Sequence, residues 1–206
     1  TEAVQLIGSQ AGRSLDTVVR EVLNGGTNVQ YHEGERASRS AIIATDTLTV
    51  KAVRAAVRTL KRQNAETIDG SFVGIIHPDV AFDLMSDPTW VEWHKYTDND
   101  AMFTNEIGKI ANVRFVETTE AKIFEDAGGS TDKFDIYSTL IIAKNAYGTT
   151  NIEGGGLELI TKQKGSAGTA DPLDQRSTVG WKATKTAERL VEDYMVRIET
   201  ACSYAA

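Results

Sequence analysis

The opening of the chain carries a helical pattern of apolar positions. Within residues 2–23, apolar side chains recur at steps of three and four, at Val4, Ile7, Ala11, Leu15, Val18, Val19 and Val22. This spacing predicts an amphipathic helix, which at 1.5 Å per residue is expected to be roughly 33 Å long. Asn24-Gly25-Gly26 follows and favours the left-handed backbone that ends helices. Gly8 and Gly12 are expected to weaken this helix, unless another backbone packs closely against them.

A second helical pattern begins near Thr49, whose hydroxyl makes it a suitable N-cap. Its inward positions are apolar, at Val50, Val53, Val57 and Leu60. Its outward positions are basic, at Lys51, Arg54, Arg58, Lys61 and Arg62. Gly70 ends this region, and the apolar run over residues 72–76 predicts a short buried strand.

Two prolines mark the helices that follow. Pro78 comes directly after His77 and predicts the first position of a third helix, where the missing N–H is harmless. Asp87-Pro88 repeats this signal before a short helix that contains Trp90 and Trp93.

Strands dominate the second half of the chain. They are expected over residues 113–116, 134–143, 147–152, 157–161, 178–187 and 194–201. Gly154-Gly155-Gly156 predicts a hairpin between the third and fourth of these strands, and residues 189–193 join the last two. Residues 27–44 predict an exposed loop with one short strand at 41–43. Helices first and strands later indicate an α+β protein.

Composition narrows the class of protein only slightly. The 206 residues are 41% hydrophobic and 25% charged, as in ordinary soluble proteins, and the net charge is −7. An acidic balance argues against a dedicated nucleic-acid binder. No apolar run reaches the roughly 20 residues that span a bilayer, so no membrane partner is expected. Cys202 has no second cysteine for a disulfide. A start at Thr1 instead of Met suggests a processed or truncated product.

Candidate chemistry is sparse. His77 and Asp79 could form a hydrolytic pair, but no nucleophile motif lies nearby, and a strand end followed by a helix start is the favoured interpretation. The histidines and Cys202 lack the spacing of a zinc site. The glycine-rich stretches lack the Lys-Ser/Thr that follows a phosphate-binding loop. We therefore expect no catalytic residue, no metal and no cofactor.

Two surfaces remain open to more than one interpretation. The basic face of the second helix is by default a solvated face, with an acidic partner or the phosphates of DNA as the alternative. Trp90 and Trp93 lie three positions apart and fit either local core or an interface anchor. The residues alone thus predict a soluble α+β protein without a visible active site.

A series of passages along nearly the whole chain adds a specific resemblance. They cover residues 15–28, 57–62, 75–81, 107–118, 146–148, 153–158 and 165–184. The last of them is a long small-residue loop, with Asp171-Pro172-Leu173-Asp174-Gln175-Arg176, that runs into a strand. In this order they resemble the major capsid proteins of tailed bacteriophages or prophages, in the branch typified by short-tailed coliphages.

The resemblance implies a Hong Kong 97-type fold. Residues 1–45, with the spine helix, and residues 149–206 are then expected to form a peripheral domain. Residues 46–148 would form an axial domain. The N-terminal arm and extended loop that precede the spine helix in this family are not found in the chain. A core that cannot assemble alone is therefore one expectation.

The resemblance also implies a function. It predicts a non-enzymatic subunit that self-assembles into an icosahedral shell, in the virion and in the host cytoplasm during assembly. Expected partners are copies of itself, packaged DNA through loose non-specific contact, and scaffold, portal and decoration proteins. Interface candidates are Trp90, Trp93, Arg176 and Trp181. An encapsulin-like compartment shell is one alternative, and a small hydrolase using His77 and Asp79 is another.

Overall fold

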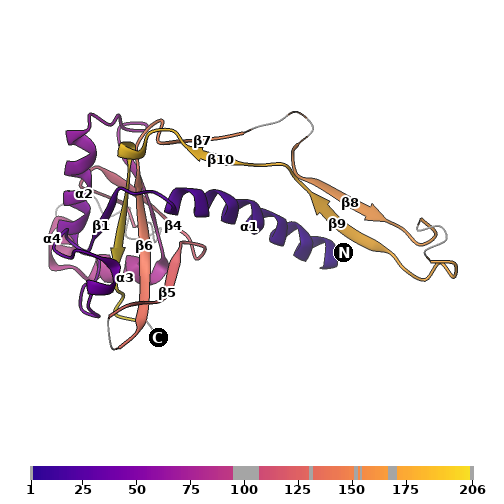
Figure 1. Cartoon of the computed structure of the whole chain (residues 1–206), viewed down its shortest axis with the longest axis horizontal. Helices are drawn as coiled ribbons and strands as arrows, with labels where there is room; N and C mark the ends of the chain where they lie inside the picture. Colours follow the sequence, from indigo (N-terminus) through magenta and orange to yellow (C-terminus); the bar gives the residue numbers. More distant parts are fainter. Residues whose placement is uncertain are drawn as a thin grey trace. The chain divides into compact units, whose positions relative to one another are not determined.

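The computed structural model in Figure 1 describes residues 2–94, 107–129, 132–150, 153, 155–166 and 171–204. The chain divides into two compact units. The helix–ribbon unit consists of Thr1–Val22 and Gly148–Glu188, and the sheet unit consists of Leu23–Tyr147 and Arg189–Ala206. Each unit is therefore built from two segments that lie far apart in the sequence.

A mixed sheet forms the centre of the sheet unit. In the described residues its order is β1 (Val29–Tyr31), β11 (Met195–Thr200), β6 (Phe134–Ile142), β2 (Phe72–Ile76), β4 (Val113–Glu117) and β3 (Lys109–Ile110). β5 (Ile123–Gly128) also pairs with β6. β6 runs antiparallel to β11 and β2, whereas β1 is parallel to β11 and β2 is parallel to β4. The strands at the two ends of this order, β1 and β3, are only three and two residues long, and the six-residue β5 is a third edge, since β6 is its one partner among the described strands.

The main core lies between this sheet and the helices α2 (Val50–Arg62), α3 (Pro78–Ser86) and α4 (Pro88–His94) (Figure 1). Tyr137 and Ile141 on β6 belong to this core. Successive side chains of a strand point to opposite faces, so Ile136 belongs to a smaller cluster with Ile42 and Ala201. The sheet is thus covered by helices on one face and by loops on the other.

Side-chain caps fix where the helices begin. Thr49 Oγ1 accepts a hydrogen bond from the N–H of Ala52 at 3.1 Å, which confirms the predicted N-cap of α2. The carboxylate of Asp87 binds the first turns of two helices. Its Oδ1 accepts a hydrogen bond from the N–H of Thr89 at 2.8 Å, and its Oδ2 accepts one from the N–H of Val50 at 2.9 Å. The carboxylate of Asp87 therefore ties the start of α4 to the start of α2.

A buried ionic cluster joins the second face of the sheet to the loop before α2. Glu199 on β11 is fully buried and receives two hydrogen bonds from the guanidinium of Arg39, at 2.7 and 2.8 Å. Arg197 donates a third, at 2.8 Å, and also binds the main-chain oxygens of Asn24 and Gly26. One carboxylate thus serves two arginines, and the network holds the end of α1 (Glu2–Asn24) against the sheet.

The helix–ribbon unit is built differently. β8 (Glu158–Lys162) and β9 (Thr178–Lys182) form an antiparallel ribbon, and β7 (Tyr147–Thr149) pairs with β10 (Ala187–Arg189). Among the described residues of this unit, only Ala11, Asp171 and Ala187 are buried. No atom of the described chain lies within 4 Å of a Cβ added at Gly8 or Gly12. A unit with so little core depends on other surfaces to cover its apolar side chains.

The structure corrects several sequence predictions. The hairpin expected between residues 147–152 and 157–161 does not form, since β7 pairs with β10 and β8 pairs with β9. The single strand expected over residues 178–187 is instead two: β9 ends at Lys182, and β10 begins at Ala187. Residues 41–43 form no strand: Arg39–Ala41 is a 3-10 turn, and Ile42 is apolar because it fills the smaller cluster. The long helix and the helices at Thr49 and Pro78 are confirmed.

Candidate subunit interfaces and a basic hollow

His77 and Asp79, the pair considered for hydrolysis, lie together at the start of α3. His77 Nδ1 accepts a hydrogen bond from the N–H of Asp79 at 3.2 Å, so this nitrogen caps the helix. The Tyr137 hydroxyl donates to Asp79 Oδ2 at 3.2 Å. Burial, reinforced by the Asp79 charge, raises the pKa of Tyr137 to about 12, and burial raises the pKa of the Cys202 thiol to about 11. Both groups stay protonated near neutral pH, so the cluster offers no activated nucleophile.

These two raised pKa values predict alkaline destabilisation. Tyr137 and Cys202 hold their protons more tightly when folded, so stability is complete below the unfolded-state pKa values and falls as pH rises through 9 to 12. We expect the double variant Tyr137→Phe with Cys202→Ala to show a flatter decline. Urea unfolding at a series of alkaline pH values measures this, with Tyr147→Phe, a half-exposed tyrosine, as the control. An unchanged pH dependence in the double variant would contradict the prediction.

The described residues show no other sign of chemistry. They contain no group of three or more His, Cys, Asp or Glu placed to hold a metal ion. Among the described helices, none combines the length and the apolar character needed to cross a membrane.

The four interface candidates have different environments. Trp90 lies in the main core at 5% exposure, which is one of the two alternatives left open by the sequence. The Trp93 side chain lies outside what the structure describes. Trp181 on β9 is half-buried and donates its indole N–H to Gln10 Oε1 at 3.1 Å. Arg176 is exposed, with its main-chain N–H bound to Asp171 Oδ2 at 2.7 Å. Their roles in an interface stay predictions.

Large apolar side chains are exposed on both units. In the helix–ribbon unit they include Leu6, Leu157, Leu159 and Leu173, which are 44% to 73% exposed. In the sheet unit, Phe82 and Tyr204 form an edge-to-face ring contact at 5.3 Å and are 49% and 66% exposed. Phe82 and Tyr204 thus form a contiguous exposed apolar surface, the kind of surface that binds other proteins. Sequence analysis did not select these residues, because exposure depends on the tertiary fold.

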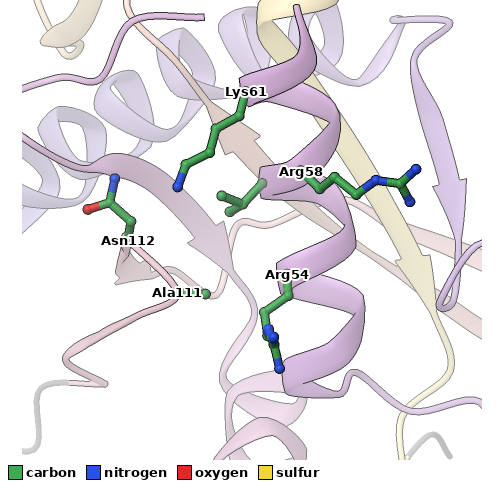
Figure 2. A pocket seen from close by; sticks show the side chains of 6 residues that line it. Arg54, Arg58, Lys61, Ala111 and Asn112 are labelled. Atoms are coloured by element: carbon green, nitrogen blue, oxygen red, sulfur yellow. The ribbon is translucent and has the colours of Figure 1, made fainter. Parts of the chain in front are cut away.

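A basic hollow lies beside α2 in the sheet unit. It has a volume of about 290 Å³ and is lined by Arg54, Val57, Arg58, Lys61, Ala111 and Asn112. Figure 2 shows Lys61 reaching from the helix toward Asn112, whereas Arg58 extends away from it. Ala111 and Asn112 have φ values of 50° and 68°, the left-handed turn that joins β3 to β4. This tight turn brings the far wall of the hollow close to the helix.

The cations of this surface differ from others in the sheet unit. Lys51 bonds Glu33 and Glu35, Lys144 bonds Glu66 at 2.9 Å, and the side chain of Arg36 bonds Asp46. By contrast, Arg54, Arg58, Lys61 and Arg62 form no ion pair with any residue that the structure describes. The sequence predicted this outward basic face, but not the second wall at Ala111–Asn112.

Comparison with solved structures identifies the fold. The capsid of Ralstonia phage GP4 is 18% identical, with a TM-score of 0.58 over 85% of this chain and 52% of that one. The head structure of Helicobacter pylori bacteriophage KHP40 is 12% identical, with a TM-score of 0.67 over 97% and 68%. The SrpI encapsulin complex from Synechococcus elongatus is 7% identical, with a TM-score of 0.56 over 98% and 64%. The chain therefore spans between about half and two thirds of these solved chains.

Sequence comparison identifies the family. Curated proteins give no match. Residues 1–163 of the 206, however, match the family described as phage capsid protein. The architecture agrees, because the α+β chain has the Hong Kong 97-type capsid fold that the resemblance implied. Such proteins are structural and not enzymatic, in keeping with a His77–Asp79 pair that caps a helix. The chain belongs to the phage capsid protein family.

Proposed function

We propose that this chain is a structural subunit whose copies associate into a closed icosahedral shell around DNA. The observation that carries the proposal is the helix–ribbon unit, which exposes Leu6, Leu157, Leu159 and Leu173 and buries only three of its described residues. Apolar surface on a unit without its own core is stabilised by contact with other surfaces. Closed symmetry multiplies modest contacts of this kind over many copies.

The finer features of the proposal follow the family resemblance. A unit made from Thr1–Val22 and Gly148–Glu188 supports a peripheral domain that joins the start of the chain to its last third. The expected division into residues 1–45 with 149–206, and residues 46–148, is kept as a proposal. We also propose membership of the short-tailed coliphage branch and assembly in the host cytoplasm. Scaffold, portal and decoration proteins are proposed partners.

Self-association tests the proposal. A core that cannot complete a shell by itself still carries these exposed apolar surfaces, so sedimentation velocity at rising protein concentration is expected to show a growing population of small oligomers. Leu159→Glu places a charge on the exposed apolar surface of the ribbon and Arg176→Glu reverses the charge of its loop, so both are expected to reduce association. Thr178→Glu and Lys185→Glu introduce the same charges at other exposed positions and serve as matched controls. A chain that stays monomeric at every concentration would refute the proposal.

An encapsulin-like shell is the second candidate, favoured by the likeness to an encapsulin over 98% of the chain. The two functions differ in what the particle encloses. Nuclease-protected nucleic acid inside purified particles would support the capsid function, whereas a protein cargo found by mass spectrometry would support the compartment.

A further inference from the structure

We infer that the basic hollow beside α2 is a binding site for the phosphodiester backbone of nucleic acid. This inference rests on the proposed function, since it names where an enclosed nucleic acid contacts the subunit. The hollow is lined by Arg54 and Lys61 on the helix and by Asn112 on the opposite wall. Arg58, which borders the hollow but extends away from Asn112 (Figure 2), and Arg62 continue the basic surface along the helix.

The spacing of the cations fits a nucleic-acid strand. From Arg54 to Arg62 the helix rises about 12 Å, at 1.5 Å per residue. Four positive charges over this length give one charge per about 3 to 4 Å of helix axis. Duplex DNA carries a similarly dense line of negative charge, with one phosphate per about 3.4 Å of its own axis on each strand. The row therefore complements a phosphate backbone in charge density along its axis.

The surroundings of the row leave its charges available. Neither Arg54 nor Arg58 has an acidic partner among the described residues, although the chain carries a net charge of −7. In such a chain most of the surface repels a polyanion, so a local group of unneutralised cations concentrates its contact at one place. Arginine forks bind phosphate oxygens in pairs, and Lys61 adds a point charge.

The remaining walls explain why the contact is independent of base sequence. Val57, which is mostly buried, and Ala111 add no polar side chain to the hollow. Asn112 lines the same hollow as Lys61. An amide can hydrogen-bond phosphate, whereas reading bases requires side chains that reach into a groove. The hollow is thus suited to hold a backbone and not to select a sequence.

Binding of a fluorescent random-sequence DNA duplex to the full chain tests this inference. In the triple variant Arg54→Glu, Arg58→Glu and Lys61→Glu, affinity is expected to fall at least about tenfold at about 50 mM salt, and the slope of log affinity against log salt by about 2 to 3. The control Lys162→Glu, Lys164→Glu and Lys185→Glu changes the net charge equally at exposed positions outside the sheet unit. It is expected to retain most of the affinity. Amide NMR shifts in α2 and at residues 111–112 would locate the contact in the wild-type chain.

Absence of DNA binding by the wild-type chain would overturn the inference, and so would an equal loss of DNA affinity in both triple variants. Stronger binding of polyglutamate than of DNA would also overturn it, because it would indicate an acidic protein partner. Sedimentation of the same variants separates this inference from the proposed function. Self-association that persists while DNA binding is absent leaves the shell proposal standing, whereas a monomeric chain that still binds DNA contradicts the shell proposal alone.

Discussion

Replacing Glu199 with alanine is expected to lower the free energy of unfolding of the sheet unit by about 3–5 kcal/mol. The carboxylate is fully buried and accepts three hydrogen bonds, two from Arg39 and one from Arg197. Its removal leaves the guanidinium groups of Arg39 and Arg197 without this anion, and Arg197 is buried. Since small proteins are stable by only about 5–15 kcal/mol, this loss removes a large share of the total.

A surface pair provides the control for Glu199. Glu66 binds Lys144 at 2.9 Å in the same unit, and both side chains are more than half exposed. Solvent screens such a pair, so Glu66→Ala is expected to change stability by less than about 1 kcal/mol. Urea unfolding followed by circular dichroism measures both variants. Equal effects would show that the buried cluster is not an important source of stability.

Replacing Trp90 with alanine is expected to cost about 3–5 kcal/mol of stability. The indole is 5% exposed and packs in the main core, so its loss removes a large apolar surface and leaves a cavity. The smaller change Trp90→Phe keeps an aromatic ring and is expected to cost less. This result would distinguish a core tryptophan from an interface anchor, the two alternatives that the sequence left open.

The neighbouring residue supplies the matched comparison. Val91 follows Trp90 on α4 but is 42% exposed, so Val91→Ala is expected to leave thermal stability nearly unchanged. Thermal unfolding and sedimentation together give the answer. If Trp90→Ala kept full stability and lost only self-association, Trp90 would be an interface residue and the core assignment would be wrong.

The sequence predicted the starts of helices well, because a cap or a proline acts on residues next to it in the chain. The hydroxyl of Thr49 caps the helix beside it, and Pro78 begins the helix that contains it. Pairing between distant segments could not be predicted in the same way. β8 pairs with β9, not β7, although a glycine run lies between β7 and β8. β5 was missed because Glu125 and Asp126 interrupt its apolar alternation.

The candidate surfaces likewise combine features that follow from local sequence with features that depend on the tertiary fold. The outward row of Arg54, Arg58 and Lys61 follows from helical spacing alone, so the sequence predicted it. The opposite wall is set by a left-handed turn at Ala111–Asn112, which lies about 50 residues away in the chain. Family membership was predicted from the order of many short passages and is confirmed. No local signal could have shown that Leu159 is exposed.

The edges of the central sheet have a consequence for the proposed assembly of many copies. A long open edge offers unpaired N–H and C=O groups to any neighbouring chain, and so invites aggregation through sheet extension. Here β1 and β3 offer only three and two residues, and the pairing of the third edge strand, β5, with β6 is interrupted by a register shift between Phe124 and Gly128. Off-pathway fibres of stacked sheets are therefore disfavoured even when local concentration is high. Ordered growth then has fewer kinetic traps to escape.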